Sequence, residues 1–500
     1  MPARTLMVQG TASHVGKSVL VAAFCRLFHR QGLRVAPFKA QNMSNNSFVT
    51  PDGKEIGRAQ AVQAAACRLP PRADFNPVLI KPSGELQAQL VVNGEVAGTL
   101  EASDFGRVRR DYASVVEQAF ARLAEEFDLV VLEGAGSPAE VNLRGIDIVN
   151  MHMAKVARAP VVLVGDIDRG GVLAALVGTM ALLAPEERRH VRGFLVNKFR
   201  GDRDLLTPGL RVVEERTGVP CLGVLPFWRA MSVPQEDALE WDALSPTPTE
   251  RADAVAIGVA DVPCISNFTD MEPLARECDV RLLRVTGPTS EPLDALIFPG
   301  TKQTAQALRF VRERRIDDVA RRVQAGGGTI LGVCGGYQLL GRRILDPDGV
   351  ESPETVLEGL GLLDVVTSFA RSKVTVQVSG IHKPSGCPIE GYEVHMGRTV
   401  VGERVSRLFE VQGRDEGSLR AEGAVSADGR VMGTYIHGAF DAPLFRRWFL
   451  NEVRATRGWK ALDPRPEPSL DQRLDQLADF VALHVDIPRI AAIATRDRFL

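Results

Sequence analysis

The chain has 500 residues, of which 45% are hydrophobic and 24% charged, and its formal net charge is −2. These values are typical of a globular enzyme with two or three domains, and the near-neutral charge disfavours nucleic acid as the main partner. The seven cysteines form no CxxC pair, so neither a disulfide framework nor a zinc ribbon is indicated. The N-terminus has no secretory pattern, and no apolar run is long enough to span a bilayer, which predicts a cytoplasmic protein without membrane contact.

Short apolar segments alternate with helical patterns from the start of the chain. The segments are rich in Val and Leu without period-2 alternation, as strands buried on both faces are. Helical patterns cover 18–30 and 111–127. This alternation predicts a doubly wound α/β domain over residues 1–240. Its expected strands lie at 6–10, 34–38, 128–134, 160–166, 193–197 and 221–227.

A second α/β series follows a polar, proline-containing stretch, which we interpret as a linker at 241–253. The series predicts a second doubly wound α/β domain at 254–450, which becomes richer in strands near 373–380. A C-terminal helical tail is expected at 451–500, because apolar residues recur at helical spacing from Leu470. The strands expected in the second domain lie at 255–260, 280–285, 295–300 and 328–334.

The stretch GTASHVGKS, Gly10 to Ser18, ends like a phosphate-binding loop but has five residues instead of four between its first glycine and GKS. A strand is expected before it and a helix after it, so backbone N–H groups and the helix dipole favour a phosphate there. An exposed glycine-rich turn is the alternative. The residues predicted to bind ATP are Gly10, Thr11, Gly16, Lys17 and Ser18, together with Asn197, which ends a later strand and is placed to contact the base.

A metal-bound phosphate also needs oxygen ligands near the loop. The Ser18 hydroxyl and Glu133, at the end of an expected strand, are predicted to bind Mg²⁺. A second carboxylate could also take part in this metal site, and the candidates for it are Glu55, Asp166 and Asp168.

The stretch FKAQNMSNN, residues 38–46, is rich in amides directly after an expected strand. Either it is a solvated loop, or it binds a polar, carboxylate-bearing substrate beside the γ-phosphate. On the second interpretation the substrate-binding residues are Lys39, Asn42 and Asn45.

Cys334 follows an apolar segment and is flanked by glycines in GVCGGYQ. A glycine-flanked nucleophile between a strand and a helix has the pattern of a nucleophile elbow, and the helix start favours the thiolate. His437 is the expected base, with His395 as the second candidate. The expected oxyanion donors are the backbone N–H groups of Gly335 and of Gly300 or Thr301.

Two known families are similar to the two halves. The first half resembles the dethiobiotin-synthetase-like branch of P-loop NTPases, and the second resembles the flavodoxin-like class I glutamine amidotransferases. In this order they resemble the cobyric acid synthase family over essentially the whole chain. The motifs that carry the resemblance are PFKAQNMSNN, NPVLIKP, EGAGSPAEVNL, GDIDRGG, NKFRGD, FPGTKQT, GVCGGYQLLG and GYEVHMG.

This resemblance implies an ATP-dependent ligase that takes nitrogen from glutamine and uses Mg²⁺. The implied substrate is a small corrinoid, (adenosyl)cobyrinic acid a,c-diamide, whose b, d, e and g carboxylates become amides in cobalamin biosynthesis. Two alternatives stay open: another corrinoid amidase, such as the a,c-diamide synthase, and a nucleotide-switch binding protein of the ParA/MinD kind. Many amidotransferases carry a glutamate two residues after the histidine, where this chain has Ala439, so the group that orients His437 is open and Asp441 is a candidate.

Overall fold

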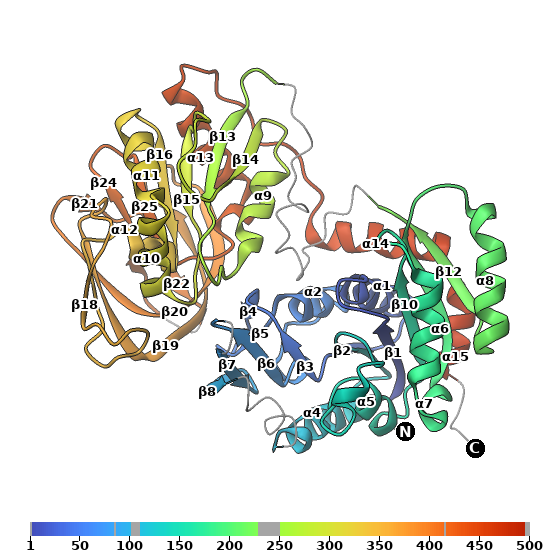
Figure 1. Cartoon of the computed structure of the whole chain (residues 1–500). Coiled ribbons are helices and arrows are strands. Elements are labelled where there is room, and N and C mark those ends of the chain that lie inside the picture. Colours follow the sequence, from blue (N-terminus) through green and yellow to red (C-terminus); the bar gives the residue numbers. More distant parts are fainter. Residues whose placement is uncertain (1–2, 85–86, 102–110, 229–250, 415–416, 496–500) are drawn as a thin grey trace.

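The structure is a computed structural model that describes residues 3–84, 87–101, 111–228, 251–414 and 417–495. The chain forms two lobes (Figure 1): the first half builds one, the second half builds the other, and the last helices return to the first lobe. Most of the predicted linker at 241–253 lies outside the described residues. Within the described residues, no helix combines the length and the apolar character that crossing a membrane requires.

The first lobe is built on a parallel six-stranded sheet in the order β12-β11-β10-β1-β9-β2. Its strands are almost entirely buried, which explains why their sequences are continuous apolar runs. Each predicted strand is present, shifted by one or two residues at most. The bounds are β1 (Arg4–Gly10), β2 (Val35–Phe38), β9 (Leu129–Glu133), β10 (Val161–Asp166), β11 (Val191–Phe199) and β12 (Cys221–Pro226).

Helices connect these strands across both faces of the sheet, so the predicted doubly wound α/β class is confirmed for this lobe (Figure 1). The phosphate-loop segment follows β1, and Glu133 ends the adjacent β9, so both lie at the carboxyl edge of the sheet. The helices are α1 (Lys17–Arg30), α2 (Arg58–Ala66), α4 (Ala113–Glu126), α5 (Met151–Val156), α6 (Val172–Leu182), α7 (Pro185–Arg188) and α8 (Arg203–Thr217).

Two small sheets that the sequence did not predict extend the first lobe toward the second. Strand β4 contacts both β19 and β20 of the second lobe. One sheet pairs β4 (Ser47–Val49) with β5 (Glu55–Gly57), and the other contains β3 (Gln41–Met43), β6 (Val78–Pro82), β7 (Gln87–Val92) and β8 (Glu95–Glu101).

The second lobe has a seven-stranded sheet in the order β14-β13-β15-β16-β25-β24-β21, parallel from β14 to β25. The predicted second α/β domain is thus present, with its four expected strands. The strands are β13 (Val255–Ala260), β14 (Val280–Val285), β15 (Ala295–Phe298), β16 (Thr329–Val333), β21 (Val405–Ser406), β24 (Ala424–Ser426) and β25 (Val431–Thr434). The helices are α9 (Glu272–Ala275), α10 (Thr304–Glu313), α11 (Ile316–Ala325), α12 (Gly335–Leu340) and α13 (Pro443–Thr456).

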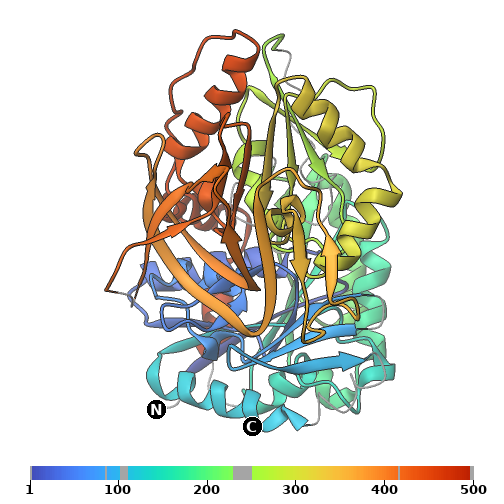
Figure 2. The same ribbon diagram turned by 90° about the vertical axis from the view of Figure 1, so that its left-hand side faces the viewer.

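The strand-rich region predicted near 373–380 is a further sheet beside this core. Its long antiparallel pair β19–β20 extends toward the first lobe (Figure 2). The strands are β17 (Arg343–Leu345), β18 (Val356–Glu358), β19 (Val365–His382), β20 (Pro388–Val401), β22 (Phe409–Gly413) and β23 (Arg420–Glu422).

The C-terminal tail packs on both lobes: its start stays with the second lobe, where Val453 and Trp459 join the core, and its last two helices pack on the first lobe. Helix α13 crosses the predicted boundary at residue 450, and α14 (Leu470–His484) and α15 (Ile487–Thr495) then lie against α1, β1 and β12 (Figure 1). Leu474, Leu477 and Val481 of α14 are buried in the same apolar cluster as α1. The C-terminal helices therefore complete the hydrophobic core of the first lobe.

Candidate active sites

Cys334 occupies a strained turn between β16 and α12. Its backbone has φ 52° and ψ −111°, a conformation that costs free energy for a residue with a side chain. The turn also needs glycine, because a Cβ atom at Gly336 would lie 2.0 Å from the carbonyl oxygen of Phe298. This geometry is that of a nucleophile elbow, as the sequence predicted.

The thiol is largely buried, with 6% of Cys334 exposed. Its Sγ donates a long hydrogen bond, 3.6 Å, to the carbonyl oxygen of Val394 on β20. Cys334 is also the N-cap residue of α12, so it lies at the start of that helix.

His437 follows β25, and its ring is fully buried beside Cys334. Its Nδ1 lies 2.7 Å from Oδ2 of Asp270. Nε2 makes no conventional hydrogen bond within the described residues, so it is the nitrogen left to exchange a proton with the thiol. This arrangement supports the predicted roles of Cys334 as nucleophile and His437 as base, and it adds Asp270 as the carboxylate that holds the ring.

The pKa of His437 is raised to about 10. Burial alone would lower it, but the Asp270 carboxylate and the Cys334 sulfur favour the charged ring more strongly. The imidazole next to the sulfur is therefore protonated at neutral pH.

The orienting carboxylate belongs to Asp270, so the candidate Asp441 is wrong. Asp270 lies on the short helix η4 (Phe268–Met271), and its Oδ1 also accepts a hydrogen bond of 2.9 Å from the backbone N–H of Gly438. Asp441 instead accepts a 3.5 Å hydrogen bond from Arg58 of the first lobe. No spacing motif reveals Asp270, because it precedes the histidine by 167 positions; the one local signal is a polar stretch, SNFTD, shortly after β13.

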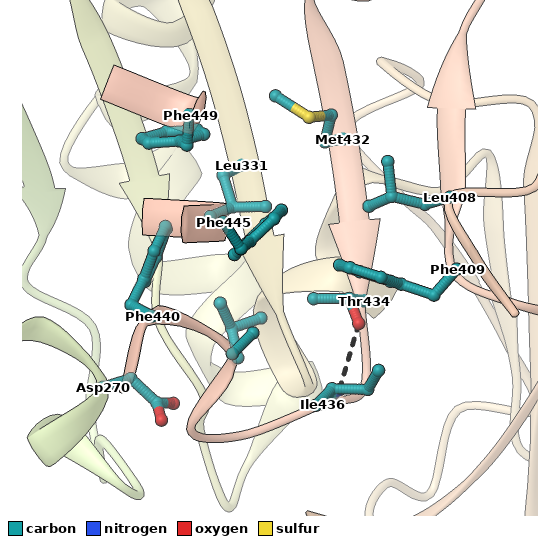
Figure 3. Close-up of a pocket in the computed structure, with 12 residues that line it drawn as sticks. Asp270, Leu331, Leu408, Phe409, Met432, Thr434, Ile436, Phe440, Phe445 and Phe449 are labelled. Carbon is teal, nitrogen blue, oxygen red and sulfur yellow. Dashed lines mark hydrogen bonds between the residues drawn. The ribbon is translucent and has the colours of Figure 1, made fainter. Parts of the chain in front are cut away.

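Asp270 borders an apolar pocket that is lined in part by β16 and β25, the strands that end before Cys334 and His437 (Figure 3). Such surroundings exclude water and strengthen the electrostatic interaction between the carboxylate and the imidazole. The aromatic side chains of this pocket are Phe409, Phe440, Phe445 and Phe449.

The predicted oxyanion residues lie around the same atoms. A Cβ at Gly335 would be 3.0 Å from the backbone nitrogen of Thr301, and one at Gly300 would be 3.1 Å from Cε1 of His437. The loop after β15, which contains Gly300 and Thr301, therefore packs against both the turn at Cys334 and the ring of His437. Backbone N–H groups that stabilise an oxyanion need to lie this close to the nucleophile. The ring of His395 is engaged elsewhere, since its Nδ1 lies 2.7 Å from the carbonyl oxygen of Gly397.

In the first lobe, the phosphate loop joins β1 to α1. Gly16 has φ 98° immediately before the helix, where glycine is favoured. The Lys17 ammonium donates hydrogen bonds to the carbonyl oxygens of Ala12, at 2.9 Å, and Gly136, at 3.2 Å. Asn197 donates a hydrogen bond of 2.8 Å to the Val15 carbonyl oxygen, which places its amide against the loop; its contact with the base stays a prediction.

Glu133 is the centre of this site. Its carboxylate accepts hydrogen bonds from the Ser18 hydroxyl at 2.7 Å, the Lys39 ammonium at 2.8 Å and the Gln63 amide at 2.6 Å. Burial alone would raise its pKa, but Lys39 and these donors lower it, so Glu133 is ionised at neutral pH. Ser18 and Glu133, predicted as a pair of metal ligands, are thus in direct contact.

The three candidates for a second carboxylate are paired with cations. Glu55 forms ion pairs with Lys81 and with Lys373 of the second lobe, and they hold its pKa well below the usual value although burial opposes this. Asp166 pairs with Lys198 at 2.8 Å, and Asp168 with Arg200 at 2.7 Å. Across the described parts of the chain, no three or more His, Cys, Asp or Glu side chains gather into a group that could hold a metal ion.

Comparison with known proteins matches each lobe to one family. Residues 6–237 match the CobQ/CobB/MinD/ParA nucleotide binding domain, and residues 256–445 match the CobB/CobQ-like glutamine amidotransferase domain.

Relatives named cobyric acid synthase align along nearly the whole chain. The protein from Pelotomaculum thermopropionicum is 46% identical and aligns over 98% of this chain and 96% of its own length. That from Sorangium cellulosum is 46% identical over 100% of both chains, and that from Cereibacter sphaeroides is 48% identical over 99% and 100%. The chain belongs to the cobyric acid synthase family. The predicted class, a glutamine-hydrolysing ligase with a nucleotide-binding domain, is confirmed, and the comparisons favour it over the two alternatives.

In this member of the cobyric acid synthase family, the three predicted substrate-binding residues have different surroundings. Lys39 contacts Glu133, and Asn42 donates a hydrogen bond of 2.9 Å to Gln60 within the first lobe. Asn45 lines a pocket together with Phe268 of the second lobe. Of the three, Lys39 has a direct contact with the predicted phosphate and metal site, and the roles of all three stay predictions.

Proposed function

We propose that the chain converts (adenosyl)cobyrinic acid a,c-diamide into cobyric acid. Four peripheral carboxylates, b, d, e and g, would become amides, each with one glutamine hydrolysed and one ATP consumed. The observation that carries this proposal is the presence, in one chain, of an assembled thiol site and a phosphate loop in contact with a buried carboxylate. The relatives that align end to end are named cobyric acid synthase, which supports this substrate.

The second lobe would release nitrogen from glutamine. The Cys334 thiolate attacks the side-chain amide carbon, and backbone N–H groups near Gly335 and Gly300 stabilise the oxyanion. His437, held by Asp270, gives its proton to the departing nitrogen, so ammonia leaves and a glutamyl thioester remains. Water, deprotonated by His437, then hydrolyses the thioester to glutamate and regenerates the thiol.

The first lobe would activate the acid. A corrinoid carboxylate oxygen attacks the γ-phosphorus of ATP, ADP leaves, and an acyl phosphate forms. Ammonia then attacks the acyl carbon and phosphate departs. Lys17 and Lys39 offer positive charge beside the transferred phosphoryl group, where transition-state charge develops.

The donors at Glu133 suit Mg²⁺, because a hydroxyl and an ionised carboxylate are hard oxygen ligands in contact at the end of the phosphate loop. Ser18 and Glu133 would hold the ion, which neutralises phosphate charge when bound.

Mass spectrometry of the purified enzyme incubated with adenosylcobyrinic acid a,c-diamide, MgATP and amide-¹⁵N glutamine tests the proposal. Four successive ¹⁵N incorporations are expected. The proposal would be contradicted if the a,c-diamide took up no ¹⁵N. If, in a parallel incubation, cobyrinic acid itself took up two ¹⁵N atoms, the enzyme would be an a,c-diamide synthase instead.

A further inference from the structure

The first lobe contributes a short segment, residues 45–49, to the surroundings of the thiol site. The Oδ1 atom of Asn46 accepts a 2.9 Å hydrogen bond from the backbone N–H of Phe268. The Oδ1 atom of Asn267 in turn accepts a 2.9 Å hydrogen bond from the backbone N–H of Ser47. All four residues are at least 96% buried, so neither bond competes with bulk water.

These reciprocal bonds hold the segment that carries Asp270. Asn267 adopts a left-handed backbone, φ 52° and ψ 46°, and directly precedes η4. A helix of one turn has little stability of its own, so contacts from outside decide where its side chains lie. The contacts of Asn267 and Phe268 with the first lobe thus act directly before Asp270, alongside the packing of Phe268 and Met271 in the core of the second lobe.

The same segment also contacts the strand beside the base and the thiol. The Tyr392 hydroxyl donates a 2.9 Å hydrogen bond to the Ser47 carbonyl oxygen, and the Phe48 and Tyr392 rings lie 5.0 Å apart. Tyr392 exchanges two backbone hydrogen bonds with His437. On the same strand, Val394 packs with Val49 and accepts the hydrogen bond from the Cys334 thiol.

At its other end, this stretch of chain leads to the phosphate site. It begins at Lys39, whose ammonium is bonded to Glu133, and continues through β3 to Asn46 and Ser47. One stretch of chain, buried except at Met43, thus joins Lys39 beside Glu133 to the residues that contact the triad segment.

We propose that residues 45–49 of the nucleotide lobe complete the glutaminase site, with Asn46 and Asn267 as positioning residues that hold Asp270 against His437. This rests on the glutaminase half of the proposed function. The consequence is that efficient glutamine hydrolysis requires the two lobes to be docked, so nitrogen is released where the first lobe is in place to use it.

The test compares Asn46→Ala and Asn267→Gly in the full chain by glutamate release. Glycine retains the left-handed backbone at position 267 and removes only the side-chain acceptor. We expect kcat to fall roughly tenfold in each, as the loss of a buried hydrogen bond suggests, with a smaller change in KM. The alkaline limb of the pH profile should move to lower pH, because His437 loses the close carboxylate.

Gln377→Ala is the matched control. Its amide donates a hydrogen bond of 2.7 Å across the lobes to the Val49 carbonyl oxygen, somewhat shorter than the 2.9 Å bonds of Asn46 and Asn267, but this bond does not reach the segment that carries Asp270. The control should keep the wild-type kcat and pH profile, and thermal unfolding checks that all variants fold. A wild-type kcat and pH profile in both asparagine variants, or the same loss in Gln377→Ala, would overturn the proposal. Glutamate release needs no corrinoid, so this outcome is independent of the acceptor's identity.

Discussion

In the second lobe His437 lies between Cys334 and Asp270 and contacts both, whereas in the first lobe Ser18, Lys39 and Gln63 all bond to one carboxylate, Glu133. In the thiol site, Asp270 and Cys334 raise the pKa of His437. The phosphate site instead collects charges that suit an anionic ligand and its counter-ion. A substitution in the triad should therefore affect the glutamine reaction alone, while one in the phosphate loop should stop amidation from any nitrogen source.

The largest effect is expected from Cys334→Ser. Without the thiolate no thioester forms, so glutamine-dependent amidation should fall by about 10³-fold or more. Amidation with high ammonium should persist, because the first lobe is intact. Measuring both reactions on the same preparation checks this, and normal glutamine use by the variant would remove Cys334 from the mechanism.

Lys17→Ala should produce the opposite pattern. Amidation should fall about 10²–10³-fold with either glutamine or ammonium, because the charge beside the phosphates is lost. Glutamate release should remain measurable. Amidation at the wild-type rate would exclude the phosphate loop from the reaction.

Asp270→Asn should lower kcat for glutamine hydrolysis by about 10²-fold. In the wild type the alkaline limb should lie near pH 10, where His437 loses its proton. In the variant, the neutral asparagine amide no longer raises the pKa of His437, whereas burial of the ring still lowers it. The alkaline limb of the pH profile should therefore move to lower pH by roughly one unit or more. Asp441→Asn is the control, and an equal shift in that variant would contradict the role of Asp270.

The smallest effect concerns the tail that completes the first lobe. Leu477→Ala on α14 should destabilise the protein by about 2–3 kcal/mol, because its side chain is buried in the cluster around α1. Leu483→Ala, on the same helix but 80% exposed, should change stability by less than about 0.5 kcal/mol. Thermal unfolding measures both, and equal values would mean that α14 does not pack as described.

The sequence by itself determined the features that depend on neighbouring residues. The buried strands of both lobes appear as continuous apolar runs, and the elbow at Cys334 and the loop ending in Ser18 appear as glycines at fixed spacing. Helix α14 was also predictable, from the apolar residues that recur after Leu470.

Only the tertiary structure decided which distant groups meet. Asp270 has no recognisable motif and becomes the partner of His437 because η4 and the end of β25 are adjacent in space. In the same way, β4 lies beside β20, and α14 packs against α1 of the first lobe, far from it in the sequence. Local patterns fix how each segment folds, but contacts between remote segments depend on how complementary buried surfaces pack, and that packing leaves no periodic signal in the sequence.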